Sequence, residues 1–286
     1  MSSAALTRRA ALIGLGGGIA TAAIPALAAT PVLTEHRVDA PGARLYVTDT
    51  GGHGPALLLA HPVTGSALVW EHQQAAFARA GYRVVAWSRR EHARTIVTGA
   101  DPGTNADILA IAQALQLGRF HLLGSAAGGG IAIQFAVAHG ARLRSLTMAN
   151  SISGIAEPAF KDWAESLRPA PFGQLPAAMR ELGPEYRAAN PQGTQRWADL
   201  EAHARTAPLG APPAQGVTWQ DVRRLSMPVL WVTGDADLFV PPALQREAGR
   251  HAPRSHYAVI PRAGHSAYWE EPEAFNRAVL TFLQHA

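Results

Sequence analysis

The chain contains no cysteine, which excludes disulfide bonds, thiolate metal sites and a cysteine nucleophile. Charged residues are also few: they make up 16% of the sequence, whereas about 25% is usual in soluble proteins. Hydrophobic residues make up 48%, so a disordered chain is excluded and a large core is expected. The 286 residues fit one α/β domain that carries an insertion.

A long basic run is absent as well. The chain has 25 Lys and Arg against 21 Asp and Glu, and two of the arginines, Arg8 and Arg9, lie in a segment without acidic residues. The other arginines are scattered, whereas binding to nucleic acid requires clustered basic groups that neutralise phosphates. We therefore expect no nucleic-acid partner, despite the formal net charge of +4.

The N-terminal segment has the features of an export signal. Its two arginines precede a run rich in Gly and Ala at residues 10–23, and small residues near Ala28 suit cleavage after that position. The segment resembles a twin-arginine leader, whose machinery exports folded proteins. We predict a signal peptide at residues 1–28 and export of residues 29–286 to the periplasm or the medium.

A retained membrane anchor is the alternative for this segment. Four glycines between residues 14 and 18 dilute the hydrophobicity that a spanning helix requires, which favours a cleaved signal peptide. No later segment approaches the ~18–20 consecutive apolar residues of a spanning helix, so we expect no stable membrane insertion after cleavage.

Beyond the leader, short strand-like runs alternate with helical patterns. Such alternation predicts an α/β fold, with a mostly parallel sheet and helices on both faces. Thr104 and Asp107 have the spacing of a capping pair, so we expect them to cap the second helix. We predict strands near Val38 and at 44–48, 56–60, 82–87, 120–123, 143–149, 228–233 and 257–260, and helices over 67–80, 106–117, 129–139, 243–252 and from Pro272 onward.

The alternation stops between about residues 151 and 225. Prolines, glycines and amphipathic pieces replace strands there, for example at 175–182 and 194–205. We interpret this part as a helical cap inserted into the domain that spans residues 29–286.

A sharp turn between a strand and a helix is the most informative segment. It reads Gly124-Ser125-Ala126-Ala127-Gly128, between an apolar run and a Gly-rich helix start. The spacing does not match G-x-G-x-x-G and no Gly-Lys-Ser/Thr follows, so we exclude a nucleotide-binding loop. It matches a nucleophile elbow, G-x-Nu-x-G, in which small residues on both sides allow the strained turn to close.

On this motif the chain resembles the α/β-hydrolase fold superfamily, from about Val38 to the C-terminus. The resemblance places the nucleophile at Ala126, but a methyl group cannot attack a carbonyl. Moving the nucleophile back to Ser125 would turn its side chain away from the tip of the turn. We therefore interpret the Ser125 hydroxyl as structural, or as part of the pocket edge, rather than as a nucleophile.

Two later segments resemble the acid and histidine segments of this superfamily. Asp237 follows a buried strand and matches G-x-x-D-x-x-x-P, with Asp235 as the second choice, and His265 follows the last strand. The resemblance implies that Asp237 binds one imidazole nitrogen and leaves the other free to accept a proton. A surface histidine without a catalytic role is the alternative.

The resemblance also implies an oxyanion hole of backbone N–H groups. One is that of Ala127 at the start of the helix, and the other comes from the loop after residue 60. The family usually has His-Gly where this chain has His61-Pro62, and proline has no N–H, so Val63 is the candidate donor. An ordinary turn at the strand end is the alternative.

A further segment departs from the family pattern Asp-x-x-Gly-x-Gly-x-Ser. Ser88, Glu91 and Ala93 stand at its Asp and Gly positions. Together with Pro62 and Ala126, these departures favour natural divergence over a single engineered inactivation.

The candidate substrate-binding residues are His61, Ser125, Trp163 and Trp197. Aromatic residues of the predicted cap are expected to build its core first and to line a pocket second. The histidines show no H-E-x-x-H or H-x-H spacing, so we expect no metal site and no cofactor.

Three functions fit these residues. The first is hydrolysis of an ester, lactone or similar bond of a small apolar molecule, in which His265 and Asp237 activate water directly. The second is proton abstraction by the same pair, as in lyases or cofactor-free oxygenases of this fold. The third is a ligand-binding protein that has lost activity. The first ranks highest, because a retained acid and histidine argue for chemistry.

Overall fold

The computed structural model describes residues 32–208 and 216–286. The predicted signal peptide at residues 1–28 lies outside the described residues, as do residues 209–215 of the predicted cap. Within the two described ranges, no helix is both long enough and apolar enough to cross a membrane.

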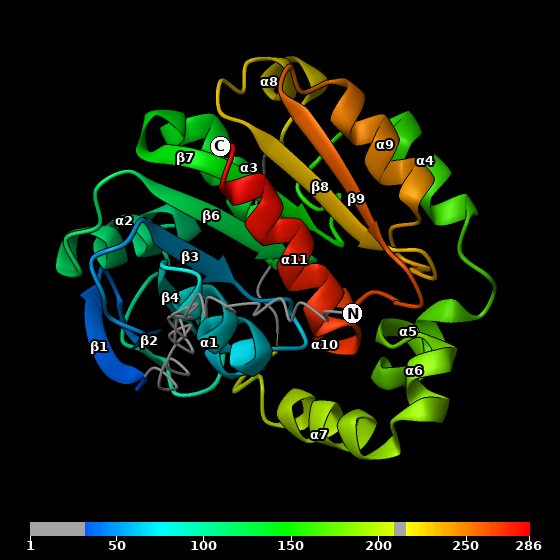
Figure 1. The fold of residues 1–286 in the computed structure, drawn as a ribbon, viewed down its shortest axis with the longest axis horizontal. Coiled ribbons are helices and arrows are strands. Elements are labelled where there is room, and N and C mark those ends of the chain that lie inside the picture. The colour runs from blue at the N-terminus through cyan, green and yellow to red at the C-terminus, as the bar shows by residue number, and fades with distance from the viewer. Residues whose placement is uncertain (1–31, 209–215) are drawn as a thin grey trace, which may run out of the picture.

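The strands form one sheet (Figure 1), in the order β1-β2-β4-β3-β6-β7-β8-β9, and the short β5 pairs with β2. The pairs β1–β2 and β2–β4 are antiparallel, and every later pair along this path is parallel. This arrangement confirms the predicted α/β fold with a mostly parallel sheet. The strands are β1 (Thr34–Ala40), β2 (Ala43–Asp49), β3 (Ala56–Ala60), β4 (Arg83–Trp87), β5 (Ile96–Val97), β6 (Phe120–Ser125), β7 (Leu143–Ala149), β8 (Val229–Gly234) and β9 (Ser255–Ile260).

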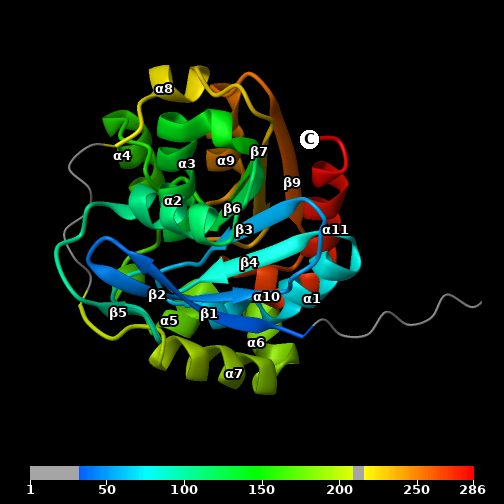
Figure 2. The ribbon, with the colours of Figure 1, turned by 90° about the vertical axis from the view of Figure 1, so that its left-hand side faces the viewer.

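Helices cover both faces of the sheet and create two hydrophobic cores (Figure 2). Phe135 and Leu244 belong to the first core, and Phe77 and Phe275 belong to the second. The first face is covered by α2 (Thr104–Ala114), α3 (Ala127–His139) and α9 (Pro242–Arg250), and the second by α1 (Glu71–Arg79), α10 (Ala267–Glu270) and α11 (Pro272–Leu283). Among the described residues, the connections also contain the short 3-10 helices η1 (Ala67–Trp70), η2 (Gly140–Arg142) and η3 (Phe172–Gln174).

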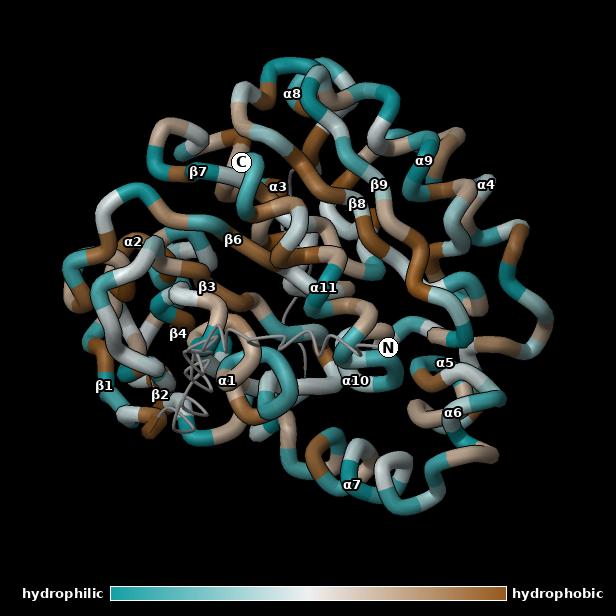
Figure 3. The backbone as a smooth tube through the Cα atoms, in the orientation of Figure 1, coloured by the Kyte–Doolittle hydropathy of each residue, from teal (hydrophilic) through white to brown (hydrophobic). Residues whose placement is uncertain are grey.

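The central strands are apolar throughout because they are buried on both sides. In β3, Leu57 and Leu59 belong to one core, and Leu58 and Ala60 belong to the other. Successive side chains of a strand point to opposite faces, so a strand between two helical layers needs apolar residues at every position. All residues of β8 are buried as well, and Figure 3 shows its hydrophobic character.

The predicted cap range divides into two parts. Side chains of α4 and α8, such as Phe160 and Val222, belong to the first core beside the sheet. In contrast, α5, α6 and α7 lie together at the end of the sheet where β8 ends (Figure 1). The sequence did not predict this division. The helices are α4 (Pro158–Ser166), α5 (Ala177–Glu181), α6 (Pro184–Ala189), α7 (Pro191–Ala202) and α8 (Trp219–Arg223).

The prediction that Thr104 and Asp107 cap α2 is wrong. Gly103 precedes the helix, and no side chain caps it. Asp107 is buried and instead accepts a hydrogen bond from the guanidinium group of Arg90 at 2.7 Å. A buried carboxylate requires such a partner, so the pairing satisfies Asp107 and ties α2 to the segment after β4.

Two glycines allow close backbone contact where β6 meets α3. A Cβ atom on Gly124 would lie 2.3 Å from the carbonyl oxygen of Gly128, and a Cβ atom on Gly128 would lie 2.2 Å from that of Ala60. Both distances are well below van der Waals contact, and the opposing atoms are backbone atoms that cannot rotate away. The structure thus explains why this turn requires small residues on both sides.

We expect Gly128→Ala to lower the free energy of unfolding by at least about 2 kcal/mol, because the added methyl group forces α3 away from β3. Gly118→Ala is the matched control, since no atom lies within 4 Å of its Cβ position. That control should stay within about 0.5 kcal/mol of the natural protein. Urea unfolding measures both variants, and equal stabilities for the two would contradict this account of the turn.

Candidate active site

Ala126 occupies the tip of the turn between β6 and α3. Its backbone is left-handed, with φ 49° and ψ −117°. Such a conformation costs about 1–3 kcal/mol for a residue with a Cβ atom, so its surroundings must hold it in place. Its N–H donates to the carbonyl of Ala149 at 3.0 Å, and its own carbonyl accepts from the Ser151 hydroxyl at 2.6 Å. The turn therefore has the strained backbone of a nucleophile elbow, but the side chain at its tip is a methyl group.

Ser125 ends β6 and is fully buried. Its Oγ has no hydrogen-bond partner within the described part of the chain. The role of Ser125 as a structural or pocket-edge hydroxyl stays a prediction.

Asp237 and His265 meet at the end of β8. His265 Nδ1 lies 2.9 Å from both carboxylate oxygens of Asp237. Both side chains are buried, with His265 6% and Asp237 2% exposed. Because Asp237 occupies Nδ1, Nε2 of the imidazole is the nitrogen available to a substrate or a water molecule.

Neighbouring donors hold the Asp237 carboxylate in place. Oδ2 accepts hydrogen bonds from the Asn150 amide and the Thr233 hydroxyl, both at 3.0 Å, and Oδ1 accepts from the N–H groups of Phe239 and Val240 at 2.8 and 2.9 Å. Sequence reasoning missed Asn150, which follows β7 and has φ 48°. Asparagine adopts this left-handed region more readily than most residues. An Asn directly after a strand can therefore indicate a sharp turn at that position.

Burial and ion pairing oppose each other at this pair. Burial alone would raise the pKa of Asp237, but the charge of His265 and the surrounding hydrogen bonds hold that pKa below its ordinary value. Burial alone would lower the pKa of His265, but the charges of Asp237 and then Glu181 hold it above the ordinary value. The pair therefore stabilises the imidazolium ion that His265 becomes when it accepts a proton as a general base.

The two backbone groups predicted for the oxyanion hole lie at neighbouring ends of β3 and β6. Ala127 is the first residue of α3, and Val63 lies in the loop after β3. Neither N–H donates a hydrogen bond to another group of the described residues. The missing side chain of Gly128 lets the start of α3 approach the carbonyl groups of Ala60 and His61, which brings this helix end to the loop. Two free donors at one edge suit the binding of an oxyanion.

The structure places His61, a substrate-binding candidate from the sequence, in the interior of the protein beside the loop after β3. It is fully buried, and its Nε2 accepts the N–H of Arg89 at 3.0 Å. Its Nδ1 therefore carries the proton and donates to the carbonyl of Pro62 at 2.7 Å. Burial, followed by the nearby charge of Arg89, lowers the pKa of His61 well below its ordinary value, so the ring stays neutral. His61 thus fixes the Val63 loop against the segment after β4.

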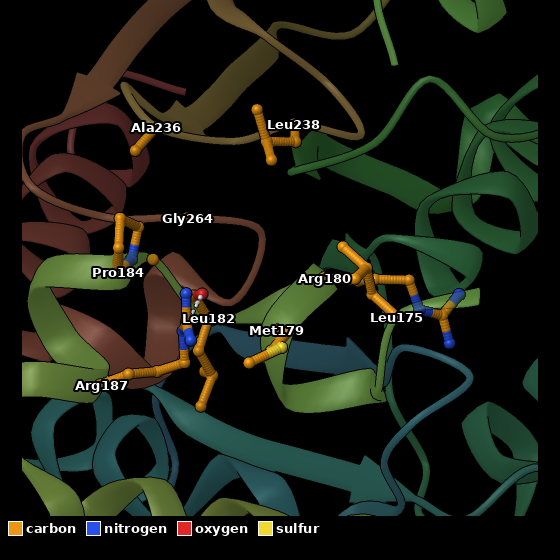
Figure 4. Close-up of a pocket in the computed structure, with 10 residues that line it drawn as sticks. Leu175, Met179, Arg180, Leu182, Pro184, Arg187, Ala236, Leu238 and Gly264 are labelled. Atoms are coloured by element: carbon orange, nitrogen blue, oxygen red, sulfur yellow. Dashed lines mark hydrogen bonds between the residues drawn. The ribbon is translucent and has the colours of Figure 1, made fainter. Parts of the chain in front are cut away.

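Neither tryptophan chosen from the sequence lines the cavity beside the histidine loop. Trp197 is buried in the second core, and Trp163 lies on α4 with 38% of its surface exposed, near Phe160. Figure 4 shows the cavity between α5–α6 and the loops after β8 and β9. Its lining is mostly apolar, with Leu175, Met179, Leu182, Ala236, Leu238 and Gly264, and it also includes two basic residues, Arg180 and Arg187.

Two buried glutamates near His265 were missed by sequence reasoning. Glu270 on α10 accepts N–H groups from Gly183 at 2.6 Å, Gly264 at 3.0 Å and Ser266 at 3.1 Å. It therefore fastens the cap segment to the loop that carries His265. The second is Glu181 at the end of α5. Across the described ranges, no group of three or more His, Asp or Glu side chains could hold a metal ion.

The family model of the alpha/beta hydrolase fold matches residues 55–272 of this chain. A 2-hydroxy-6-oxononadienedioate/2-hydroxy-6-oxononatrienedioate hydrolase of Burkholderia vietnamiensis is 28% identical over 267 residues, which cover 84% of this chain and 91% of the relative.

Solved structures share the fold. A thermophilic esterase from Thermogutta terrifontis superimposes with a TM-score of 0.75 at 24% identity, covering 88% of this chain and 98% of its own. An enol-lactonase from Burkholderia xenovorans superimposes with a TM-score of 0.69 at 20% identity, covering 88% of this chain and 100% of its own.

We expect Glu270→Gln to lower the free energy of unfolding by about 1–3 kcal/mol at pH 5, because the amide loses one of the two acceptor oxygens that bind the three N–H groups. Burial raises the pKa of Glu270 to about 7, so between the ordinary value of 4.5 and pH 7 the folded protein keeps a proton that the unfolded chain releases. The free energy of unfolding of the natural protein therefore falls as pH rises through this window. The variant has no titrating group at position 270, so it lacks this contribution to the pH dependence.

Urea unfolding at pH 5 and pH 8 measures this difference, which should shrink at the higher pH. Glu273→Gln, at an exposed position of α11, is the control and should change stability by less than about 0.5 kcal/mol at both values. A gap between the natural protein and Glu270→Gln that stays constant with pH would show that Glu270 does not titrate in this window.

Proposed function

This chain belongs to the alpha/beta hydrolase fold family, and from this premise we propose that it is a cofactor-free hydrolase of an ester, lactone or related bond. Its relatives include enzymes named as hydrolases of small molecules, which supports a small-molecule substrate. The cavity beside the histidine loop is lined mostly by apolar residues, together with Arg180 and Arg187, which supports a substrate with a substantial apolar part.

The observation that carries the proposal is the hydrogen-bonded Asp237–His265 pair in a fold whose sharp turn carries Ala126 and no nucleophile at its tip. With Ala126 at the tip, no acyl-enzyme can form there, so the attacking group is water. His265 Nε2 takes a proton from that water as its oxygen bonds to the substrate carbonyl carbon. Asp237 stabilises the imidazolium ion that results. The N–H groups of Val63 and Ala127 then bind the oxygen that gains negative charge.

Direct attack by water is slower than attack by an activated serine. Loss of a covalent nucleophile typically leaves the rate enhancement that substrate binding and the oxyanion hole supply, which is roughly 10³–10⁴ over the uncatalysed reaction. We therefore assign this protein a slow hydrolytic reaction, or one whose substrate is itself reactive.

We expect the natural protein to hydrolyse p-nitrophenyl esters with no initial burst of p-nitrophenol, because no acyl-enzyme accumulates. His265→Ala should lower kcat/KM by about 10²–10⁴-fold, since it removes the general base. His53→Ala changes an exposed histidine without a hydrogen-bond partner in the described structure and should leave kcat/KM unchanged. Ala126→Ser should introduce a burst that is lost again in Ala126→Ser/His265→Ala. A burst from the natural protein, or an active His265→Ala variant, would refute direct water activation.

Proton abstraction from carbon is the second candidate function. It is favoured by the same pair, because removal of a proton requires His265 and Asp237 but no hydroxyl at position 126. An inactive natural protein beside an active Ala126→Ser variant would favour this reaction, or a role in ligand binding, over hydrolysis.

We propose further that residues 1–28 direct export through a twin-arginine pathway. The paired arginines, the weakly hydrophobic run and the small residues before position 29 support this assignment. N-terminal sequencing of protein from a periplasmic fraction should give a chain that begins at Ala29. Replacement of both Arg8 and Arg9 by Lys should keep the precursor in the cytoplasm. Recovery of the uncleaved chain in the membrane fraction would favour the retained anchor instead.

A further inference from the structure

A glutamate is the one buried residue of the short cap helix α5. Of residues Ala177–Glu181, only Glu181 is buried, with 5% of its surface exposed. A surface helix normally buries its apolar side and leaves its charges in water. Ala177 and Ala178 pack partly buried against the second core, so the unusual feature of α5 is that it buries a carboxyl group as well.

Glu181 lies directly against the loop that carries His265. Its carbonyl oxygen accepts the N–H of Ser266, the residue after His265, at 3.0 Å. Two residues later, the N–H of Gly183 donates to Glu270, which also accepts from the N–H of Gly264. These bonds fix the end of α5 on both sides of His265, so backbone contacts hold the backbone of Glu181 against the histidine loop.

The carboxyl group of Glu181 has no partner that would stabilise its charge. Its Oε2 is buried and makes no hydrogen bond within the described chain, and none of the ion pairs found in the described ranges includes Glu181. An unpaired buried carboxylate costs several kcal/mol, so the neutral acid is favoured. Burial accordingly raises the pKa of Glu181, while the charge of His265 lowers it.

We propose that Glu181 is the general acid of this active site and protonates the leaving oxygen while His265 accepts the proton of the attacking water. This inference rests on the proposed hydrolytic function and adds a residue to it. Ordinary enzymes of this kind use the histidine for both transfers, because the nucleophilic serine supplies its proton first. Here the single step with water needs a base and an acid together, and the cap supplies the acid.

The proposed step balances in protons and electrons. The water oxygen bonds to the carbonyl carbon and releases one proton to His265 Nε2. The bond between that carbon and the leaving oxygen breaks, and this oxygen takes the proton of the Glu181 carboxyl group. The imidazolium then passes its proton to the Glu181 carboxylate, which restores both groups. The products are a carboxylic acid and an alcohol.

Several charged or titratable groups surround Glu181 and set its protonation. His265 is the first of them, and its charge favours the ionised form of Glu181, whereas Asp237 and Glu201 disfavour it. Arg180 precedes Glu181 and favours its ionised form, but its guanidinium lies over the Phe239 ring, 6.0 Å from the centroid. Burial raises the pKa of the Tyr268 phenol, and the charge of Glu181 raises it further.

Leaving groups of different basicity test the role of Glu181. Ethyl esters release a strongly basic alkoxide that needs an acid, whereas p-nitrophenyl esters release an anion that leaves without one. We expect Glu181→Gln to lower kcat/KM for ethyl esters by about 10²-fold and to change that for p-nitrophenyl esters by less than about 3-fold. Glu185→Gln, an exposed position on α6, is the matched control and should leave both values unchanged. An equal loss on both esters would overturn the proposal, since it would indicate a structural or purely electrostatic role.

A titration that needs no turnover separates this proposal from the hydrolytic function itself. In protein labelled with 13C at glutamate side-chain carboxyls, the signal absent from Glu181→Gln should titrate above the ordinary glutamate range. In the same variant, the labelled His265 imidazole should titrate at lower pH than in the natural protein. If neither ester is hydrolysed but both titrations behave as expected, the hydrolytic function fails while Glu181 remains an acid coupled to His265. A Glu181 signal that titrates at its ordinary value overturns the general acid, whatever the activity.

Discussion

The contact between the start of α3 and the end of β3 is the constraint on which the rest of the site depends. Gly128 lies so close to the carbonyl of Ala60 that no side chain fits between them. This contact forces the chain to turn sharply at Ala126 and brings the first N–H of α3 to the Val63 loop. The elbow and the oxyanion donors are therefore consequences of one backbone packing, and they persist whichever side chain occupies the tip of the turn.

The charges of the site are arranged around His265 from two layers. The sheet supplies Asp237, whose carboxylate is held by several donors and remains ionised. The cap supplies Glu181, which has no such donors, so burial favours its neutral form. The pKa values of the two carboxyl groups are thus displaced in opposite directions, because the donors of the described residues bind only Asp237 as an anion. When the surroundings shift the pKa values of two carboxyl groups in opposite directions, one site can provide both a base and an acid.

The sequence predicted what depends on local pattern. β3 and β7 have their predicted bounds, and the glycines of the turn are explained by backbone contacts. Prediction from the sequence failed where a residue's position depends on a contact between distant segments. Asp107 pairs with Arg90 rather than capping α2, and His61 is enclosed by a loop that no local pattern reveals. Glu181 could not be found either, because its burial results from the docking of α5 on residues more than eighty positions later.

The strained backbone at Ala126 shows that this turn has the geometry of a nucleophile elbow without a nucleophilic side chain. A left-handed backbone at this point benefits a nucleophile, which it presents to the substrate, but it brings no benefit to a methyl group. It is kept because the packing of α3 on β3 allows no other path for the chain. The elbow geometry is therefore no evidence for elbow chemistry in this protein. The evidence for chemistry lies in buried titratable groups: the hydrogen-bonded pair of His265 and Asp237, and Glu181, whose Oε2 has no hydrogen-bond partner among the described residues and to which we assign proton transfer.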